Sequence, residues 1–191
     1  MRQQPRLLTS PKYIDERERC IMATITKTYK ESVPPLRFIG KKYLDSDRVN
    51  GTFGAKWGEW FQNGWFGTVE KQFDGNLTDV YENGNAYIGL MRENSDGIFE
   101  YWIGILMPAE TTVPEGFGFV DLPAGELGVC WIYGKESEVY IPESECKKQL
   151  EAAGFDVNTD WCIERCACPR FTTPDEKGNI ILDICFYLNK G

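Results

Sequence analysis

The sequence predicts an α+β fold in which two halves of the chain repeat the same order of strands and helices. Two anchor stretches, Gly97 to Met107 and Gly178 to Leu188, carry apolar residues at alternate positions when their first glycines are matched. This alternation is typical of strands that bury one face. Aromatic residues at helical spacing after Thr52 indicate an amphipathic helix instead. Strands and helices of these kinds predict a sheet with helices packed against it.

The first half is expected to contain four strands and one helix. The strands are predicted at residues 23–30, 36–44, 86–92 and 97–107, and the helix starts at residue 52. Thr52 is a suitable cap for this helix, and Gly64 is expected to stop or kink it. Aromatic residues on one stripe of the helix favour packing between helix and sheet, which is the usual role of such a stripe. They are Phe53, Trp57, Trp60 and Phe61.

The second half repeats this order. Its strands are predicted at residues 117–121, 127–133, 161–168 and 178–188, and its helix at 144–153. Ser144 is the expected cap of the helix, and Gly154 is its expected C-terminal stop. The repeated order supports one domain built from two similar units.

Residues 1–21 are polar and charged, so we expect a flexible leader there. Met22 is an alternative start. The folded domain is predicted to extend from residue 22 to residue 191. Its first repeat covers about 22–110 and its second about 111–191.

Composition restricts the function classes. The chain has 191 residues, 42% of them hydrophobic, which suffices for one domain with a substantial core. A formal net charge of −8 gives a surface that repels nucleic-acid phosphates, so we expect no nucleic-acid partner. Because the chain has no apolar run of about 18 residues and no apolar secretion signal, we expect no membrane span. Seven cysteines without framework spacing fit a reducing, cytoplasmic location.

The chain contains no histidine. This excludes serine–histidine and cysteine–histidine nucleophile pairs and removes the usual zinc ligand. Any acid–base chemistry must come from carboxylates, tyrosines, cysteines or lysines. Zinc sites rarely use the spacing of Cys162, Cys166 and Cys168. We therefore interpret these cysteines as small buried side chains and expect neither a metal nor a cofactor.

The second face of each anchor stretch combines a carboxylate with aromatic residues. It carries Glu100 and Trp102 in the first stretch and Asp183 and Tyr187 in the second. A face of this composition indicates a surface that holds something, and a solvated face with an edge tryptophan is the alternative. Both interpretations stay open on this pattern alone.

Four segments of the chain resemble a known family. They are VPEGFGFVDLPAGELGVCWIYG at residues 113–134, YIGLM at Tyr87, YWIGI at Tyr101 and the closing ILDICFYL. Together they are similar to the GyrI-like small-molecule-binding domain, the effector-binding domain of multidrug-sensing regulators, over residues 23–189. The last strand departs from the family pattern, because Asp183 stands where glutamate is commoner and the usual proline is missing.

The resemblance implies two strand–helix–strand–strand repeats related by a pseudo-twofold axis. These repeats would form a concave antiparallel sheet with helices on its convex side. Members of the family use the concave face to bind bulky, often cationic aromatic compounds, with aromatic walls and a buried carboxylate. Some free-standing members hydrolyse reactive cyclopropane-bearing antibiotics. A leader that ends at residue 21 is too short for a helix-turn-helix, which favours the free-standing class.

A carboxylate among apolar and sulfur side chains loses hydration, which disfavours its charged form until a cation restores the balance. Aromatic rings add stacking and cation–π contacts. Glu126 is a weaker candidate, because it stands at the exposed end of a strand. The candidates for ligand contact are Glu100, Trp102, Trp131, Tyr133, Glu164, Asp183 and Tyr187.

Three functions stay open. The first is binding of a bulky hydrophobic cation, for sequestration or sensing, with a small molecule as the partner and an unspecified oligomeric state. The second is hydrolysis of a strained electrophile, with Glu164 or Asp183 as the acid–base group and Trp102 or Trp131 positioning the substrate. The third is a scaffold without a ligand, whose concave face would be filled by its own side chains.

Overall fold

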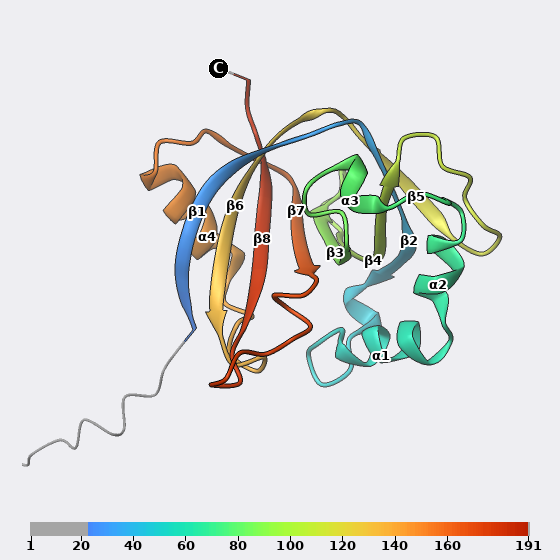
Figure 1. Cartoon of the computed structure of the whole chain (residues 1–191), viewed down its shortest axis with the longest axis horizontal. Helices are drawn as coiled ribbons and strands as arrows, with labels where there is room; N and C mark the ends of the chain where they lie inside the picture. The colour runs from blue at the N-terminus through green and yellow to red at the C-terminus, as the bar shows by residue number, and fades with distance from the viewer. Residues whose placement is uncertain (1–22, 191) are drawn as a thin grey trace, which may run out of the picture.

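The computed structural model describes residues 23–190, which form a sheet of eight antiparallel strands with helices packed against it (Figure 1). The predicted leader at 1–21 and Met22 lie outside the described residues. The strands are β1 (Thr24–Val33), β2 (Leu36–Leu44), β3 (Ala86–Glu93), β4 (Phe99–Pro108), β5 (Gly118–Leu122), β6 (Gly125–Gly134), β7 (Val157–Ala167) and β8 (Ile180–Leu188). The helices are α1 (Gly54–Gln62), α2 (Trp65–Glu70), α3 (Leu77–Val80) and α4 (Glu143–Ala152), with a 3-10 turn η2 (Asp45–Asp47).

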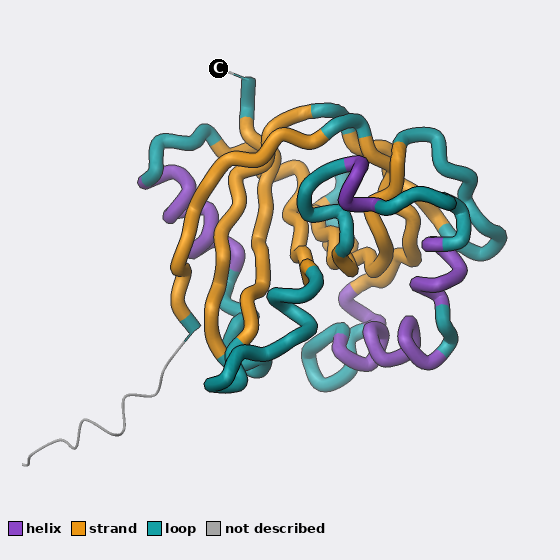
Figure 2. Tube along the Cα trace, in the orientation of Figure 1, coloured by secondary structure: helices purple, strands orange, loops and turns teal. Residues whose placement is uncertain are grey.

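The strand order confirms the predicted fold class of two related repeats. The order is β1-β6-β8-β7-β3-β4-β2-β5, so it is symmetric about the central pair β3 and β7. One repeat is β2–α1–α2–β3–β4 and the other is β6–α4–β7–β8. The strand that precedes each repeat is exchanged, because β1 pairs with β6 and β5 pairs with β2. Figure 2 shows the resulting continuous sheet. Hydrogen bonds between β1 and β6 and between β2 and β5 join strands of the two halves.

The two faces of the sheet bury different side chains. We call the face that carries α1, α2 and α4 the helix face, and its core includes Ile103 and Ile184 of the sheet with Trp60 and Leu150 of the helices. A second core on the opposite face includes Trp102 and is covered near β3 and β4 by the segment that contains α3 (Figure 1). Neighbouring residues of β4 therefore point to opposite faces, which agrees with the period of two in the anchor stretch.

Both long helices begin at positions that differ from the predicted ones. Helix α1 begins at Gly54 with Phe53 in the cap position, one residue after the predicted cap Thr52, although the Thr52 hydroxyl accepts a hydrogen bond from the Gly54 backbone N–H at 3.3 Å. Helix α4 begins at Glu143, with Pro142 in the cap position, so Ser144 lies inside the helix and does not cap it. Pro142, with φ of −56° and ψ of 132°, lies outside the helix, and the first helical turn begins at Glu143.

Two glycines end helices as predicted. Gly64 adopts a left-handed conformation with φ of 63° and separates α1 from α2. Gly154, with φ of 88°, follows Ala153, the C-cap of α4. Glycine takes up this conformation without the steric cost that a Cβ would add. None of the helices in residues 23–190 combines the length and the apolar character needed to cross a bilayer.

Candidate functional site

A cavity of about 760 Å³ opens on the helix face between the two repeats. The first repeat contributes Phe53 and Trp57 from the start of α1 and Tyr101 from β4, and the second contributes Tyr140 and Glu164. With Phe99, five aromatic side chains line this cavity, and Glu164 is the buried one of its three acidic residues, since Glu93 and Glu143 are exposed. A cavity of this size and composition suits a drug-sized aromatic molecule.

Glu164 is held at the wall of the cavity by a chain of two hydrogen bonds. The Tyr101 hydroxyl lies 2.6 Å from Oε2 of Glu164, and the indole Nε1 of Trp57 lies 2.9 Å from the Tyr101 oxygen. An indole N–H can only donate, so Tyr101 accepts this hydrogen bond with its oxygen and donates its own proton to Glu164. The chain therefore fixes the position of the carboxyl group and the direction of the tyrosine proton.

The environment of Glu164 disfavours a negative charge. Only 8% of the residue is exposed, and within residues 23–190 no lysine or arginine forms an ion pair with it. Burial, and to a smaller extent the nearby Glu143, raises the pKa of Glu164 to about 7, although the hydrogen bond from Tyr101 acts in the other direction. Burial and the adjacent carboxyl also raise the pKa of Tyr101 well above its usual value, so this hydroxyl stays protonated.

A glycine on the neighbouring strand makes room for this contact. Gly89 of β3 pairs directly with Glu164 of β7 at the centre of the sheet. A Cβ at Gly89 would lie 2.6 Å from the Tyr101 hydroxyl and 2.7 Å from Oε2 of Glu164. When Gly97 is matched to Gly178, the strand registers also place Gly89 and Glu164 at equivalent positions of the two repeats. The two repeats thus differ at their common centre, where one supplies the carboxyl group and the other the space for it.

Stacked rings form the wall next to the carboxyl group. The rings of Phe53 and Tyr101 are stacked, with centroids 4.3 Å apart and planes 3° from parallel. Arg48 lies over the Phe53 ring at 4.4 Å and forms an ion pair with Asp45 at 2.8 Å. The cavity therefore has a flat aromatic wall, with a guanidinium already paired at its rim.

The predicted ligand-contact residues lie on both faces of the sheet. Glu164 lines the cavity on the helix face, whereas the register places Trp102, Trp131 and Asp183 on the opposite face. Tyr187 lines a smaller cavity of about 500 Å³. This separation means that the predicted residues do not surround one common pocket. The sequence pattern predicts the main pocket on the mixed face of the anchor strands. The larger of these two cavities lies on the helix face instead.

Glu100 and Tyr133 are also engaged on the opposite face. Glu100 is buried and forms ion pairs with Arg92 at 2.9 Å and with Lys42 at 3.3 Å. Burial raises the pKa of Glu100, but the hydrogen bonds that it accepts outweigh this effect and hold the pKa below its usual value. Tyr133 donates a hydrogen bond to Asp175 at 2.7 Å. Both side chains thus have polar partners within the protein.

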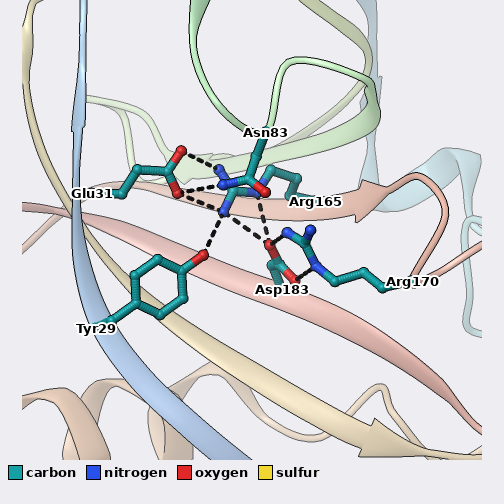
Figure 3. A network of polar contacts seen from close by, with 6 residues as sticks. All are labelled: Tyr29, Glu31, Asn83, Arg165, Arg170 and Asp183. Atoms are coloured by element: carbon teal, nitrogen blue, oxygen red, sulfur yellow. Dashed lines mark hydrogen bonds and ion pairs between the residues drawn. The ribbon is translucent and has the colours of Figure 1, made fainter. Parts of the chain in front are cut away.

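Asp183 belongs to a buried network that joins both halves of the chain (Figure 3). It accepts hydrogen bonds from Nε of Arg165 and Nε of Arg170, each at 2.9 Å, and Nη2 of Arg170 also contacts it. Arg165 in turn donates to Glu31 of β1 at 2.9 Å, and Asn83 donates to the same carboxylate at 2.9 Å. The two carboxylates face two guanidinium groups, so the charge of Asp183 is compensated within the protein.

Sequence patterns alone do not identify three residues of the site. The helical spacing predicts that Phe53 and Trp57 pack a helix against the sheet, and the period of two places Tyr101 on the apolar face of its strand. The available signal was the hydroxyl of Tyr101, the one polar group among the alternate residues of its strand face. A buried hydroxyl needs a hydrogen-bond partner, and here the partner is Glu164.

The cysteines near the site are free thiols. Cys162 lines the cavity and Cys166 is buried on the same face. Burial raises the pKa of both thiols well above the usual value, so both are protonated at neutral pH. In the part of the chain from residue 23 to 190, no three histidine, cysteine or acidic side chains are grouped so that they could hold a metal ion.

Comparison with known proteins shows what fold the chain shares. No protein-family model matches the sequence, and the curated protein sequences give no match. A candidate bacterial transcription regulation protein from Staphylococcus aureus MU50 superposes with a TM-score of 0.58 and 14% identity, over 86% of this chain and 99% of its own. SAV2435 bound to tetraphenylphosphonium gives 0.56 and 14% identity, over 85% and 94%. A hydrolase from Listeria innocua gives 0.50 and 14% identity, over 91% and 97%.

Proposed function

We propose that this protein is a GyrI-like small-molecule-binding protein that binds a bulky aromatic cation in the cavity on the helix face. One observation carries this proposal: Glu164 is a buried carboxyl group beside an aromatic cavity, and no cation within residues 23–190 is paired with it. Charged groups buried in proteins are normally paired, so an unpaired one at a cavity is a candidate binding group.

The physical basis of selectivity is charge compensation. Burial makes the carboxylate of Glu164 costly, and a ligand cation placed next to it removes that cost. The rings of Phe53, Trp57 and Tyr101 supply stacking and cation–π contacts for the same ligand. The similar fold of SAV2435, which binds tetraphenylphosphonium, supports a hydrophobic cation as the ligand class.

Among the predicted carboxylates, Glu164 is the one that compensates the positive charge of the ligand. Asp183 and Glu100 already have guanidinium or ammonium partners, so a ligand cation would gain little from them. The aromatic residues of the opposite face, Trp102 and Trp131, stay as candidates for a separate surface. A scaffold without a ligand would require a filled pocket, and the cavity of about 760 Å³ argues against that interpretation.

Quenching of tryptophan fluorescence tests the proposal, because Trp57 lines the cavity. Rhodamine 6G and a neutral aromatic compound of similar size serve as probes at pH 8.5. We expect saturable quenching by the cation. The affinity should be at least about tenfold lower in Glu164→Gln, since removing one partner of a buried charge pair costs about 2–5 kcal/mol of binding free energy. Glu126→Gln is the matched control, because Glu126 does not line this cavity. Equal affinity in all three proteins would reject the proposal.

A second candidate function is hydrolysis of a strained electrophile. The specific observation is the 2.6 Å contact between Tyr101 and Glu164, with a carboxyl pKa near the value that suits a general acid at neutral pH. Incubation with a cyclopropane-bearing electrophile and mass spectrometry of the products tests it. Turnover that falls with rising pH and disappears in Glu164→Gln supports catalysis. Binding without any product leaves the protein as a binder.

A further inference from the structure

We infer that the cavity exchanges a proton for a cation, and that its protonated state binds a second ligand class, neutral hydrogen-bond acceptors. When Glu164 of the free protein is protonated, the proton lies on Oε1. A cationic ligand displaces this proton, whereas a neutral acceptor receives a hydrogen bond from it. The inference rests on the proposed function, because both ligand classes occupy the same cavity.

The hydrogen-bond chain determines which oxygen carries the proton. Trp57 donates to the Tyr101 oxygen, so the single proton of Tyr101 is directed to Oε2 of Glu164 in either protonation state. Oε2 is therefore an acceptor throughout. Within residues 23–190, Oε1 of Glu164 has no hydrogen-bond partner, and it is not completely enclosed by protein atoms. Since Glu164 lines the cavity, a proton on Oε1 is available to a ligand there.

The groups that face Glu164 from the surrounding elements supply no positive charge. Tyr101 of β4 is a neutral donor, and Cys162 and Cys166 of β7 are protonated thiols. The segment before α4 contributes the phenol of Tyr140 and the first turn of α4 contributes the carboxylate of Glu143. Gly89 of β3 has no side chain. Each neighbour is therefore neutral or negative, which favours the protonated form of Glu164.

Two arginines line the same cavity, but both are already paired. Arg48 forms an ion pair with Asp45 at 2.8 Å, and Arg92 forms one with Glu100 at 2.9 Å. Neither forms an ion pair with Glu164 in the described part of the chain. The compensating charge for an ionised Glu164 must therefore come from outside these residues, and a bound cation is the group that provides it.

The exchange balances in atoms and charge. When the cation binds to the protonated protein, Glu164 releases one proton to the solvent. The product is a complex of the carboxylate with the cation. A neutral acceptor binds without any change in protonation. Because the carboxyl pKa is about 7, the two ligand classes must respond to pH in opposite directions.

Tetraphenylphosphonium and triphenylphosphine oxide are matched probes, since both carry phenyl rings on phosphorus and only the second is neutral and a strong acceptor. Calorimetric titration at pH 5.5 and 8.5 measures both affinities. With a carboxyl pKa of about 7, we expect the cation to bind about 30-fold more tightly at pH 8.5, and the oxide up to about 30-fold more tightly at pH 5.5. Titrations at pH 5.5 in buffers of different ionisation heat should show about one proton released per cation bound.

Variants separate this inference from the proposed function. Glu164→Gln should remove the pH dependence for both probes and the proton release, and Glu126→Gln should keep them. If the cation binds through Glu164 with the same affinity at both pH values and without proton release, the exchange is refuted and the binding function stands. If the cation does not bind at any pH, the proposed function itself fails. An oxide affinity that does not fall at pH 8.5 would refute the second ligand class.

Discussion

Replacing Glu164 with glutamine should make the protein more stable at alkaline pH while impairing its ligand binding. The reason is the cost of an ionised carboxylate in a buried position without a cation. Glutamine keeps an oxygen that accepts the hydrogen bond from Tyr101 and carries no charge at any pH. The variant therefore keeps the geometry of the site and removes only the charge.

The size of the effect follows from the pKa shift of Glu164. Its pKa rises from 4.5 to about 7 on folding, and one pKa unit corresponds to about 1.4 kcal/mol. A carboxyl group whose pKa is raised contributes its full stability below the unfolded pKa and loses it as pH rises through the folded pKa. Relative to the variant, the wild type should thus lose about 3 kcal/mol of unfolding free energy between pH 4.5 and pH 8.

Urea unfolding followed by tryptophan fluorescence measures this difference at several pH values. Other titrating groups affect both proteins equally, so the difference between wild type and Glu164→Gln isolates the buried carboxyl group. Glu126→Gln, whose side chain is about half exposed and paired with Lys30, should show a difference that stays nearly constant with pH. Parallel stability curves for wild type and Glu164→Gln would refute the claim that Glu164 is buried without compensation.

Three further substitutions test other parts of the account. Gly89→Ala places a Cβ 2.7 Å from Oε2 of Glu164, so it should lower the unfolding free energy by about 1–3 kcal/mol and weaken cation binding. Gly67→Ala is the control, because its added Cβ meets no neighbouring group within 4 Å, and it should raise the unfolding free energy by up to about 1 kcal/mol. Equal urea midpoints for the two variants would contradict this expectation. Asp183→Asn should cost about 3–5 kcal/mol in urea unfolding because it breaks a buried charge network, and unchanged stability would show that the network is dispensable. Trp57→Phe removes the donor to Tyr101 and should lower cation affinity several-fold by titration calorimetry, and an unchanged affinity would remove Trp57 from the site.

Local sequence patterns were sufficient for the strands, because a period of two and a turn glycine are properties of neighbouring residues. The anchor stretches at Gly97 and Gly178 lead into β4 and β8, and Gly64 interrupts the helix where expected. The exchange of β1 and β5 between the repeats was not predicted. Pairing between β1 and β6 joins residues about one hundred positions apart, and no local pattern encodes such a partner.

The site was harder to predict, because charge compensation depends on distant residues. Asp183 and Glu164 looked alike in the sequence, as carboxylates within apolar strands. The structure separates them, since Arg165 and Arg170 pair with Asp183 while Glu164 receives one hydroxyl. Arg165 also reaches Glu31, which lies 134 positions away in the chain. Which buried acid lacks a cation is therefore a property of the folded sheet.

A crystal structure of the complex with tetraphenylphosphonium at pH 8.5 would show which carboxylate binds the cation. We expect the ligand in the cavity on the helix face, with its phosphorus next to the carboxylate of Glu164 and its phenyl rings against Phe53 and Trp57. A ligand bound on the opposite face beside Trp131 and Asp183 would contradict it, because the binding charge would then come from the network that the protein already compensates.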